Sequence, residues 1–185
     1  MKENQRITLT KRLLQEALFR LLEHTPLDKI SITQLCNEAE INRATFYRHY
    51  ETPSDILLQM QMDFDHQLRQ RHPAENIHNF PQYAEAFLAD LYEHADQIKV
   101  FLKNNTSDDL LHFINQTFEL FLTQYTLGTT LDADSLKLLA AFTTGGSYHM
   151  LKQWLLGEIE KTPKEMANMI TKVLQYIATK QIFPQ

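Results

Sequence analysis

The stretch Ile41-Asn42-Arg43-Ala44-Thr45-Phe46-Tyr47-Arg48-His49-Tyr50 predicts a short helix with one buried apolar face and one solvent-exposed, cationic face. Asn42 is a favoured N-cap residue, because its side-chain oxygen accepts from a free backbone N–H of the first turn. Phe46 and Tyr50 are four residues apart, so both point to the dry side. The other positions carry cations, hydroxyls and an imidazole but no carboxylate, a combination suited to phosphates and base edges.

A second helix is predicted directly before this segment. Ser31-Ile32-Thr33-Gln34 has the form of a capping box, in which Ser31 caps the helix and Gln34 reaches back to the Ser31 N–H. The helix has to end near Glu40, so only a short turn separates it from Asn42. This spacing predicts a helix-turn-helix whose second helix faces outward.

The run from Ser31 to Tyr50, followed by Asp55-Ile56-Leu57-Leu58, resembles the DNA-binding domain of the TetR (tetracycline repressor) family of bacterial regulators. Thr45 to Tyr50 is similar to the family's run of a small residue, an apolar residue, tyrosine, two variable residues and an aromatic. The resemblance extends more loosely over the whole chain. It implies an all-α protein with a three-helix DNA-binding domain at residues 1–52 and a helical ligand-binding and dimerisation domain at residues 53–185.

The resemblance also implies which residues meet DNA. Phe46 and Tyr50 would be core, whereas Thr33 would approach the DNA backbone. The expected DNA-facing residues of the second helix are Arg43, Ala44, Thr45, Tyr47, Arg48 and His49, with Asn42 at its start. We expect Arg43 and Thr45 at base edges. The expected phosphate contacts are Tyr47, Thr33 and Lys11.

Lys11 belongs to the first predicted helix, which we expect from about Thr10 to Glu23. Thr10 would cap this helix. Lys11 and Arg12 would then stand at its exposed start, where a phosphate meets both cations and free N–H groups. A simply solvated helix end explains the same residues equally well.

Two positions depart from the family pattern. Glu40 stands where the family usually has a turn glycine, so the turn is strained if this position needs a positive φ. Pro53 stands where the family often has a lysine able to touch phosphate. Thr52-Pro53-Ser54-Asp55 still forms a coherent helix start, with Thr52 as N-cap and proline in the first turn. A structural role remains there without the phosphate contact.

Composition favours an all-helical protein, because 4 Gly and 6 Pro are few for 185 residues and the periodic segments are long. No apolar run approaches the roughly 18 residues that span a bilayer, and the first residues lack the apolar stretch of a secretory signal. We therefore expect a cytoplasmic protein without membrane contact. The single cysteine, Cys36, excludes an internal disulfide and a cysteine-based zinc site, and is expected to be a buried thiol.

The net charge of −5 is unevenly distributed along the chain. Residues 1–60 hold eight Lys or Arg and eight Asp or Glu, so the surplus acid lies beyond them. The cations of the first segment are few, although DNA affinity depends heavily on neutralising phosphates. This modest footprint predicts that specific binding needs two copies of the domain.

After a helix from Pro53 to about Arg71, the apolar residues become rich in aromatics at helical spacing. Such a stripe suits an ordinary core and equally an apolar pocket for a small-molecule effector, and the sequence does not separate the two. The candidate pocket residues are Met60, Phe64, Phe87, Phe101, Phe113, Phe118 and Phe121.

The last third predicts two long helices, from about Asp134 to Leu156 and from the capping box at Thr162 onward. Their apolar surface exceeds what a two-helix hairpin can hide, so we expect half of a four-helix bundle shared with a second subunit, as the resemblance also implies. The expected interface residues are Gly145, Gly146, Met150, Trp154, Met166, Ile170, Val173 and Ile177. A helix kink is the alternative reading of the two glycines. The shared axis would set the two reading helices about 34 Å apart, one turn of DNA, or a longer related spacing.

Enzymatic patterns are missing from the sequence: there is no glycine-rich phosphate loop, nucleophile elbow or His-Glu-x-x-His motif. We expect no cofactor and no metal. His66, His72 and His78 recur every six residues, which puts neighbours on different helix faces, so we interpret them as solvated surface.

These observations predict a homodimeric transcriptional regulator, most simply a repressor, that binds a palindromic DNA operator and responds to a small molecule. The alternative is a co-activator or protein-interaction subunit that works through another regulator. A ligand carrier without DNA function would leave the face at residues 42–50 unexplained.

Overall fold

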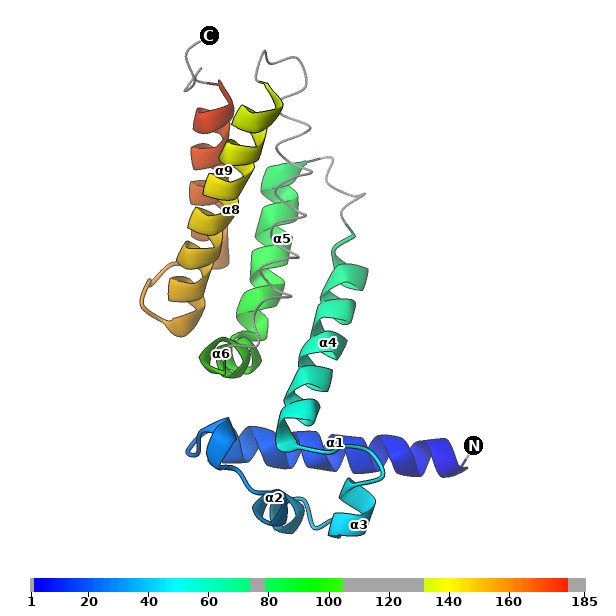
Figure 1. The fold of residues 1–185 in the computed structure, drawn as a ribbon. Helices are drawn as coiled ribbons and strands as arrows, with labels where there is room; N and C mark the ends of the chain where they lie inside the picture. The colour runs from blue at the N-terminus through cyan, green and yellow to red at the C-terminus, as the bar shows by residue number, and fades with distance from the viewer. Residues whose placement is uncertain (1, 74–78, 105–131, 180–185) are drawn as a thin grey trace. The chain divides into compact units, whose positions relative to one another are not determined.

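The computed structural model describes residues 2–73, 79–104 and 132–179, and every regular element in them is a helix (Figure 1). The elements are α1 Lys2–Leu22, the 3-10 turn η1 Leu27–Lys29, α2 Ile32–Glu38, α3 Arg43–Phe46, α4 Pro53–Arg71, α5 Phe80–Glu93, α6 Ala95–Lys103, α8 Ala133–Leu156 and α9 Pro163–Thr179. The all-α prediction is confirmed. None of these helices has the length and apolar character needed to cross a membrane.

The chain divides into two compact units. One combines Met1–Phe64 with Lys103–Thr106, and the other combines Asp65–Leu102 with Ser107–Gln185. The division falls inside α4. Ile56 and Leu57 account for this, because both are fully buried at the start of α4 and extend the first core.

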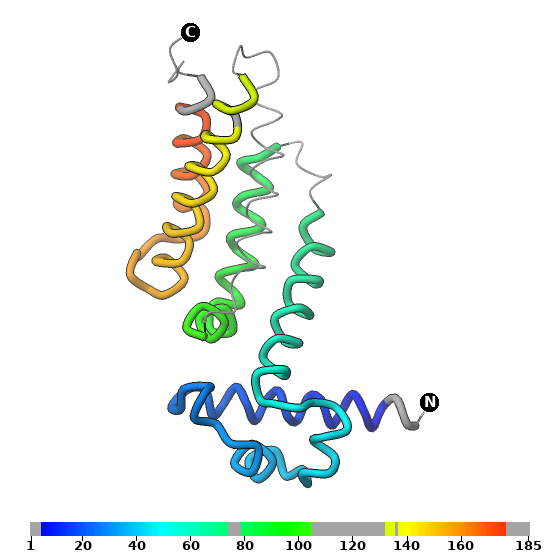
Figure 2. The backbone as a smooth tube through the Cα atoms, in the orientation of Figure 1, coloured from blue at the N-terminus to red at the C-terminus, as the bar shows by residue number. Residues whose placement is uncertain are grey.

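The N-terminal unit is built around α1, with α2 and α3 on the same side of it (Figure 2). Leu14 and Leu18 of α1 are fully buried, as are Leu35 of α2 and Phe46 of α3. Outside this core, Arg20 Nε donates to Glu38 Oε1 at 2.7 Å and ties α1 to the end of α2.

Helix α1 begins earlier than predicted. The structure starts it at Lys2, so Thr10 is not its N-cap. The Thr10 hydroxyl instead donates to the Arg6 carbonyl oxygen at 2.9 Å, a bond typical of threonine inside a helix. No proline or glycine interrupts residues 2–9, and the good helix formers among them extend the helix toward the N-terminus. Lys11 and Arg12 therefore lie inside α1, and the expected anion site at its start is wrong.

The predicted helix-turn-helix is present, and its two predicted N-caps, Ser31 and Asn42, are confirmed. Ser31 Oγ accepts from the Gln34 N–H at 3.1 Å, and Asn42 Oδ1 accepts from the Thr45 N–H at 2.8 Å. Glu40 has φ of 55°, the left-handed conformation that usually calls for glycine. The Ile41 N–H donates back to the Cys36 carbonyl at 2.9 Å and closes the turn. The strain expected at the missing glycine is therefore present.

The second helix of the motif is shorter than the predicted segment. Regular α-helix ends at Phe46, and residues 47–49 form a turn. The hydrogen bonds tighten there, since the Arg48 N–H donates to the Thr45 carbonyl and the His49 N–H to the Phe46 carbonyl. The Tyr50 N–H returns to the Phe46 carbonyl at 3.0 Å. The chain thus keeps a helical path up to Tyr50.

In the C-terminal unit, α5 packs along α9, and α8 leads into α9 through a short loop. Gly157 ends α8 with φ of 87°. The predicted capping box then starts α9: the Thr162 N–H donates to Glu165 Oε2 at 2.8 Å and the Glu165 N–H to Thr162 Oγ1 at 3.2 Å. Buried residues of this unit include Leu88, Leu91, Ile98, Leu151, Trp154, Met166, Ile170 and Leu174.

A partly buried polar cluster joins the end of α4 to α5. Asp90 Oδ2 lies 2.7 Å from Arg71 Nε and 2.7 Å from His72 Nε2, and its side chain is only 12% exposed. The Tyr83 hydroxyl donates to the His72 carbonyl at 3.0 Å. Burial alone raises the pKa of Asp90, but the hydrogen bonds from Arg71 and His72 outweigh it and leave that pKa below its usual value.

This cluster corrects the interpretation of the histidines. His72 is mostly buried and contacts the rings of Tyr83 and Phe87 edge to face, so it is not solvated surface. His66 is exposed as expected. His78 lies outside the described residues.

Candidate nucleic-acid interface

The inner side of the α3 segment anchors it to the N-terminal core. Phe46 has no exposed surface and Tyr50 is 7% exposed, as predicted. Their rings lie 6.3 Å apart between centroids. Because both aromatic rings pack into the N-terminal core, the residues between them lie on a rigid support.

The outer side carries the predicted polar residues. The exposed side chains are Asn42, Arg43, Ala44, Tyr47 and Arg48. Thr45 and His49 are half-buried at the margin of the same face. We call these seven residues the α3 face. It contains two arginines and no carboxylate.

Arg43 and Tyr47 form a pair on the α3 face. Arg43 Nη2 donates to the Tyr47 hydroxyl oxygen at 3.4 Å, and the guanidinium lies 6.0 Å from the centre of the Tyr47 ring. This hydrogen bond raises the pKa of Arg43, which therefore stays charged at any physiological pH. The pairing restrains a long side chain and lowers the entropy lost when it meets a ligand.

Lys11 reaches the same region from α1. Its Nζ lies 5.9 Å from the centre of the Tyr50 ring, and its side chain is half-buried. Burial raises the pKa of Tyr50, so this ring stays neutral beneath the ammonium group. Sequence reasoning expected Lys11 near DNA but missed its contact with Tyr50, because that contact joins residues far apart in the chain.

Helix α2 adds Thr33, which is exposed in its first turn. Neither α2 nor α3 has an acidic residue in its first turn. Their N-terminal N–H groups therefore keep a partial positive charge that favours an anion. The structure brings Lys11, Thr33 and the α3 face together within one unit, on three helices.

The residues predicted for an effector pocket are only partly described. Phe87 and Phe101 are buried in the C-terminal unit, whereas Met60 and Phe64, respectively half-buried and buried, belong to the N-terminal unit. Phe113, Phe118 and Phe121 lie outside the described residues.

The predicted dimer residues separate into two groups. Trp154, Met166 and Ile170 are at most 4% exposed and belong to the core of their own chain, which corrects their assignment to a subunit interface. Gly145, Gly146 and Val173 are exposed and Met150 is half-buried. The Ile177 side chain is outside the described part. The two glycines do not interrupt α8, which is one continuous helix from Ala133 to Leu156.

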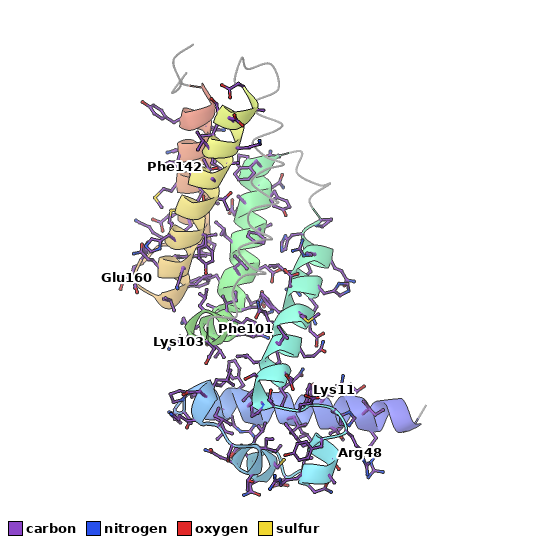
Figure 3. All side chains as sticks on the ribbon, viewed as in Figure 1. Lys11, Arg48, Phe101, Lys103, Phe142 and Glu160 are labelled. Carbon is purple, nitrogen blue, oxygen red and sulfur yellow. The ribbon has the colours of Figure 1, made fainter. Side chains whose placement is uncertain are left out.

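The exposed side of these two helices holds Val173 together with four large apolar residues that the sequence analysis did not select. On α8, Leu138 is 65% and Phe142 74% exposed, and Phe142 projects from the helix in Figure 3. On α9, Met169, Val173 and Tyr176 are 39%, 52% and 62% exposed. Their spacings of three and four residues place each set on one helix side. These five residues, with Gly145 and Gly146, are called the open α8–α9 face.

Comparison with known proteins decides the family. Residues 78–176 match the family model of a TetR transcriptional regulator C-terminal region, which covers more than half of the chain. The chain belongs to the TetR family. No curated protein sequence matches it. Members of this family are transcriptional regulators that bind DNA, and the family is not enzymatic.

Solved structures share the fold of this TetR-family protein. A TetR transcriptional regulator from Streptococcus agalactiae 2603V is 22% identical with a TM-score of 0.69, over 94% of this chain and 98% of that chain. A TetR-family regulator from Syntrophomonas wolfei str. Goettingen is 15% identical with a TM-score of 0.68, over 95% and 98%. The dihydroxyacetone kinase operon activator DhaS is 14% identical with a TM-score of 0.60, over the same shares.

Proposed function

We propose that this TetR-family protein represses transcription by binding a palindromic operator as a homodimer, and that a small-molecule effector releases it. The main observation in support of the proposal is the α3 face. It presents Arg43, Tyr47 and Arg48 to solvent on a segment fixed to the core by Phe46. Cations and hydroxyls on a rigid, carboxylate-free helix suit a DNA groove.

The contacts divide by chemistry. Arg43 and Thr45 lie in the first turn of α3, where a groove-bound helix approaches the bases, and we assign them to base edges. Tyr47 and Thr33 each carry one hydroxyl donor and Lys11 carries an ammonium group, and we assign all three to phosphates. Ala44, Arg48, His49 and the Asn42 cap complete the surface.

The open α8–α9 face supports the homodimer. Leu138, Phe142 and Val173 are each at least half exposed, which is costly in water because each buried apolar side chain contributes about 1.5 to 3 kcal/mol. A second copy presents the same face, so pairing two copies buries both and makes a four-helix bundle. Adding a Cβ at Gly145 or Gly146 would meet nothing within 4 Å in this chain, which leaves room for a close approach there.

Release by an effector follows from linkage. A ligand that binds the C-terminal unit better when the two reading heads are wrongly spaced weakens DNA binding by the same coupling free energy, typically about 1 to 3 kcal/mol. Phe87 and Phe101 supply the apolar aromatic surroundings that suit a small apolar molecule. Met60 and Phe64 on α4 are our candidates for the residues that carry the change toward the reading head.

A gel-shift assay with the DNA upstream of the protein's own gene tests the proposal. We expect a salt-sensitive, sequence-specific shift whose stoichiometry is two chains per site. Arg43→Ala should weaken operator binding by about 10- to 100-fold and random DNA far less, since one base contact is lost. Lys164→Ala, which removes an exposed cation from the first turn of α9, is the matched control and should leave the shift unchanged.

Tyr47→Phe separates the two kinds of contact. It removes one hydroxyl and keeps the ring beside Arg43, so all DNA sequences should lose affinity about equally. Equal losses of operator and random DNA for Arg43→Ala would contradict the base-edge assignment. No shift at low salt would contradict DNA binding by this face.

A second candidate function is a co-activator that works through another regulator. The similarity in fold to DhaS, which is an operon activator, favours keeping it. In that case the protein binds a regulator through its C-terminal unit, and DNA is shifted only when that regulator is present. The same gel-shift assay, with and without cell extract, distinguishes the two.

A further inference from the structure

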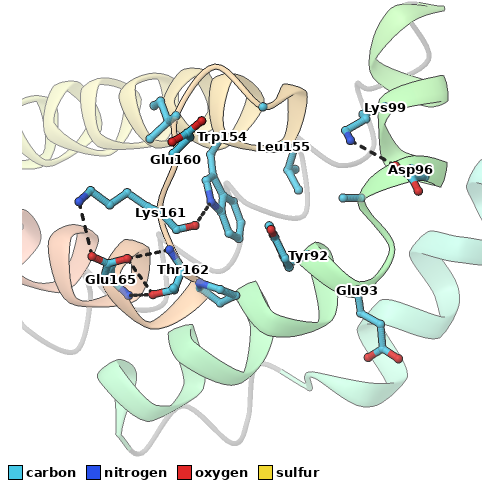
Figure 4. A pocket seen from close by; sticks show the side chains of 14 residues that line it. Tyr92, Glu93, Asp96, Lys99, Trp154, Leu155, Glu160, Lys161, Thr162 and Glu165 are labelled. Carbon is cyan, nitrogen blue, oxygen red and sulfur yellow. Dashed lines mark hydrogen bonds and ion pairs between the residues drawn. The ribbon is translucent and has the colours of Figure 1, made fainter.

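A surface cleft of about 580 Å³ lies within the C-terminal unit, between the α5–α6 corner and the α8–α9 loop (Figure 4). Its lining includes Tyr92, Glu93, Lys99, Trp154, Glu160 and Lys161. None of the residues proposed for the apolar effector lines it. The volume is within the range of small-molecule sites.

An aromatic stack forms part of the cleft wall. The rings of Tyr92 and Trp154 lie 5.3 Å apart with 24° between their planes. Trp154 is 2% exposed and its Nε1 donates to the Lys161 carbonyl at 2.8 Å, so the indole is fixed. Tyr92 is 54% exposed and presents ring surface to the cleft. The cleft therefore has a rigid aromatic surface on which a flat group can stack.

The charges around this surface are predominantly negative. The lining holds four carboxylates against the two lysines. Lys99 Nζ pairs with Asp96 at 3.2 Å, and Lys161 Nζ with Glu165 at 3.5 Å. Glu93 and Glu160 have no ionic partner among the described residues, which leaves two uncompensated negative charges.

The helix ends at the cleft do not reverse this balance. Asp96 and Glu165 lie in the first turns of α6 and α9, where they offset the positive ends of those helices. The C-terminal ends of α5 and α8, at Glu93 and Leu156, carry partial negative charge. Glu160 comes from the same loop as Lys161 and lines the cleft beside Trp154 (Figure 4).

We propose that this cleft binds a small organic cation with a flat, delocalised head group of the guanidinium type. The flat part of the ligand lies against the Tyr92–Trp154 pair and its charged end lies toward the Glu160 carboxylate, so that an aromatic surface and an unpaired anion act on one cation. The site stands apart from the DNA-binding face and does not depend on the proposed repressor function.

Trp154 makes the test direct, because it is the single tryptophan of the sequence and contacts Tyr92. The full-length protein is titrated with phenylguanidinium while tryptophan fluorescence is followed, and calorimetry confirms the binding. We expect saturable binding with a dissociation constant of about 1 mM or tighter. Phenylurea, which has nearly the same shape without the charge, should bind at least about tenfold more weakly, and benzoate should not bind. Equal affinity for phenylguanidinium and phenylurea would overturn the proposal.

Two matched variants locate the site. Glu160→Gln should weaken phenylguanidinium binding about tenfold and leave phenylurea unchanged, whereas Glu158→Gln, an exposed carboxylate of the same loop outside the lining, should change neither. Tyr92→Ala should weaken both compounds by calorimetry, with unchanged helical circular dichroism as the folding control. The same loss in both glutamate variants would show a general charge effect and reject the site. These readouts do not involve DNA, so their failure is distinct from failure of the gel shift.

Discussion

The α3 face and the open α8–α9 face differ in the type of side chain that they expose to solvent. On α3, the aromatic Phe46 is buried and the outward residues are arginines and hydroxyls. On α8 and α9, polar Thr143, Ser147 and Thr171 are buried while Phe142 and Val173 are exposed. The first surface is complementary to a polyanion, and the second is complementary to another apolar surface.

On the proposed function, the α3 face and the open α8–α9 face therefore bind their partners by different forces. Binding at the α3 face should weaken as salt rises, because it displaces counterions from phosphates. Association at the open α8–α9 face should depend little on salt, because it removes apolar surface from water. The predictions below test this comparison from the largest expected effect to the smallest.

Phe46→Ala tests whether the α3 face depends on its buried anchor. Removing a fully buried phenylalanine should lower the free energy of unfolding by about 3 to 5 kcal/mol, since a cavity replaces the ring. Urea denaturation followed by circular dichroism measures the change. Tyr47→Ala, which truncates the exposed neighbouring ring, is the control and should cost about 0.5 kcal/mol or less. Similar costs for both would contradict the division into dry and wet sides.

Phe142→Glu tests the apolar surface at the other end. A carboxylate in the centre of the proposed interface should raise the dissociation constant of the dimer by about 100-fold or more, since apolar burial is lost and a charge is desolvated. Sedimentation equilibrium across a range of concentrations measures it. Lys137→Glu adds a carboxylate to an exposed position of α8 outside this face and should keep the dimer. A dimer that survives Phe142→Glu would show that this face is not the interface.

Much of the fold was predictable because its signals are local. Ser31, Asn42 and Thr162 each accept from an N–H three residues later, a relation visible in the sequence. The buried sides of α8 and α9 were harder, since helical spacing yields several stripes and does not say which meets the chain's own core. Trp154 was therefore assigned to the interface although it packs inside, and Phe142 was overlooked.

The polar sites depended on contacts that no local pattern contains. Asp90 and His72 are eighteen positions apart and meet only because α5 packs beside the end of α4. Tyr92 of α5 and Trp154 of α8 are likewise far apart in the sequence and meet only through the packing of the C-terminal unit. The sequence held a partial signal that His72 packs against another helix. His72 precedes Pro73 at the end of a predicted helix, where a side chain has few neighbours on its own helix.

Asp90→Asn tests the carboxylate that pairs the end of α4 with α5. Because the folded state holds the pKa of Asp90 below its unfolded value of about 3.9, its ion pairs stabilise the protein above that pH and are lost as the pH falls through the folded pKa. The variant should lose about 1 to 3 kcal/mol at pH 7. Urea denaturation at several pH values should show the gap narrowing below about pH 4. A gap that widens there would contradict the assigned sign.

The smallest expected effect compares two asparagine caps. Asn42 Oδ1 accepts from the Thr45 N–H at 2.8 Å and Asn79 Oδ1 from the Gln82 N–H at 3.2 Å. Replacing either by alanine should cost about 1 kcal/mol in stability. Only Asn42→Ala should also weaken DNA binding in the gel shift, since only that cap starts the reading helix. Equal effects on DNA would show that the N-terminal surface is not the reading head.

Glu40 keeps its left-handed backbone although it carries a side chain, at a cost of about 1 kcal/mol or more relative to glycine. The bend between α2 and α3 is therefore imposed by the bonds on either side of it, including the one from Ile41 to Cys36. An exchange of Glu40 for glycine would relax the bend without reshaping it, and would also delete a negative charge beside a surface meant for phosphates. On the proposed function, Glu40 therefore lowers the affinity of the α3 face for DNA relative to a glycine at the same position.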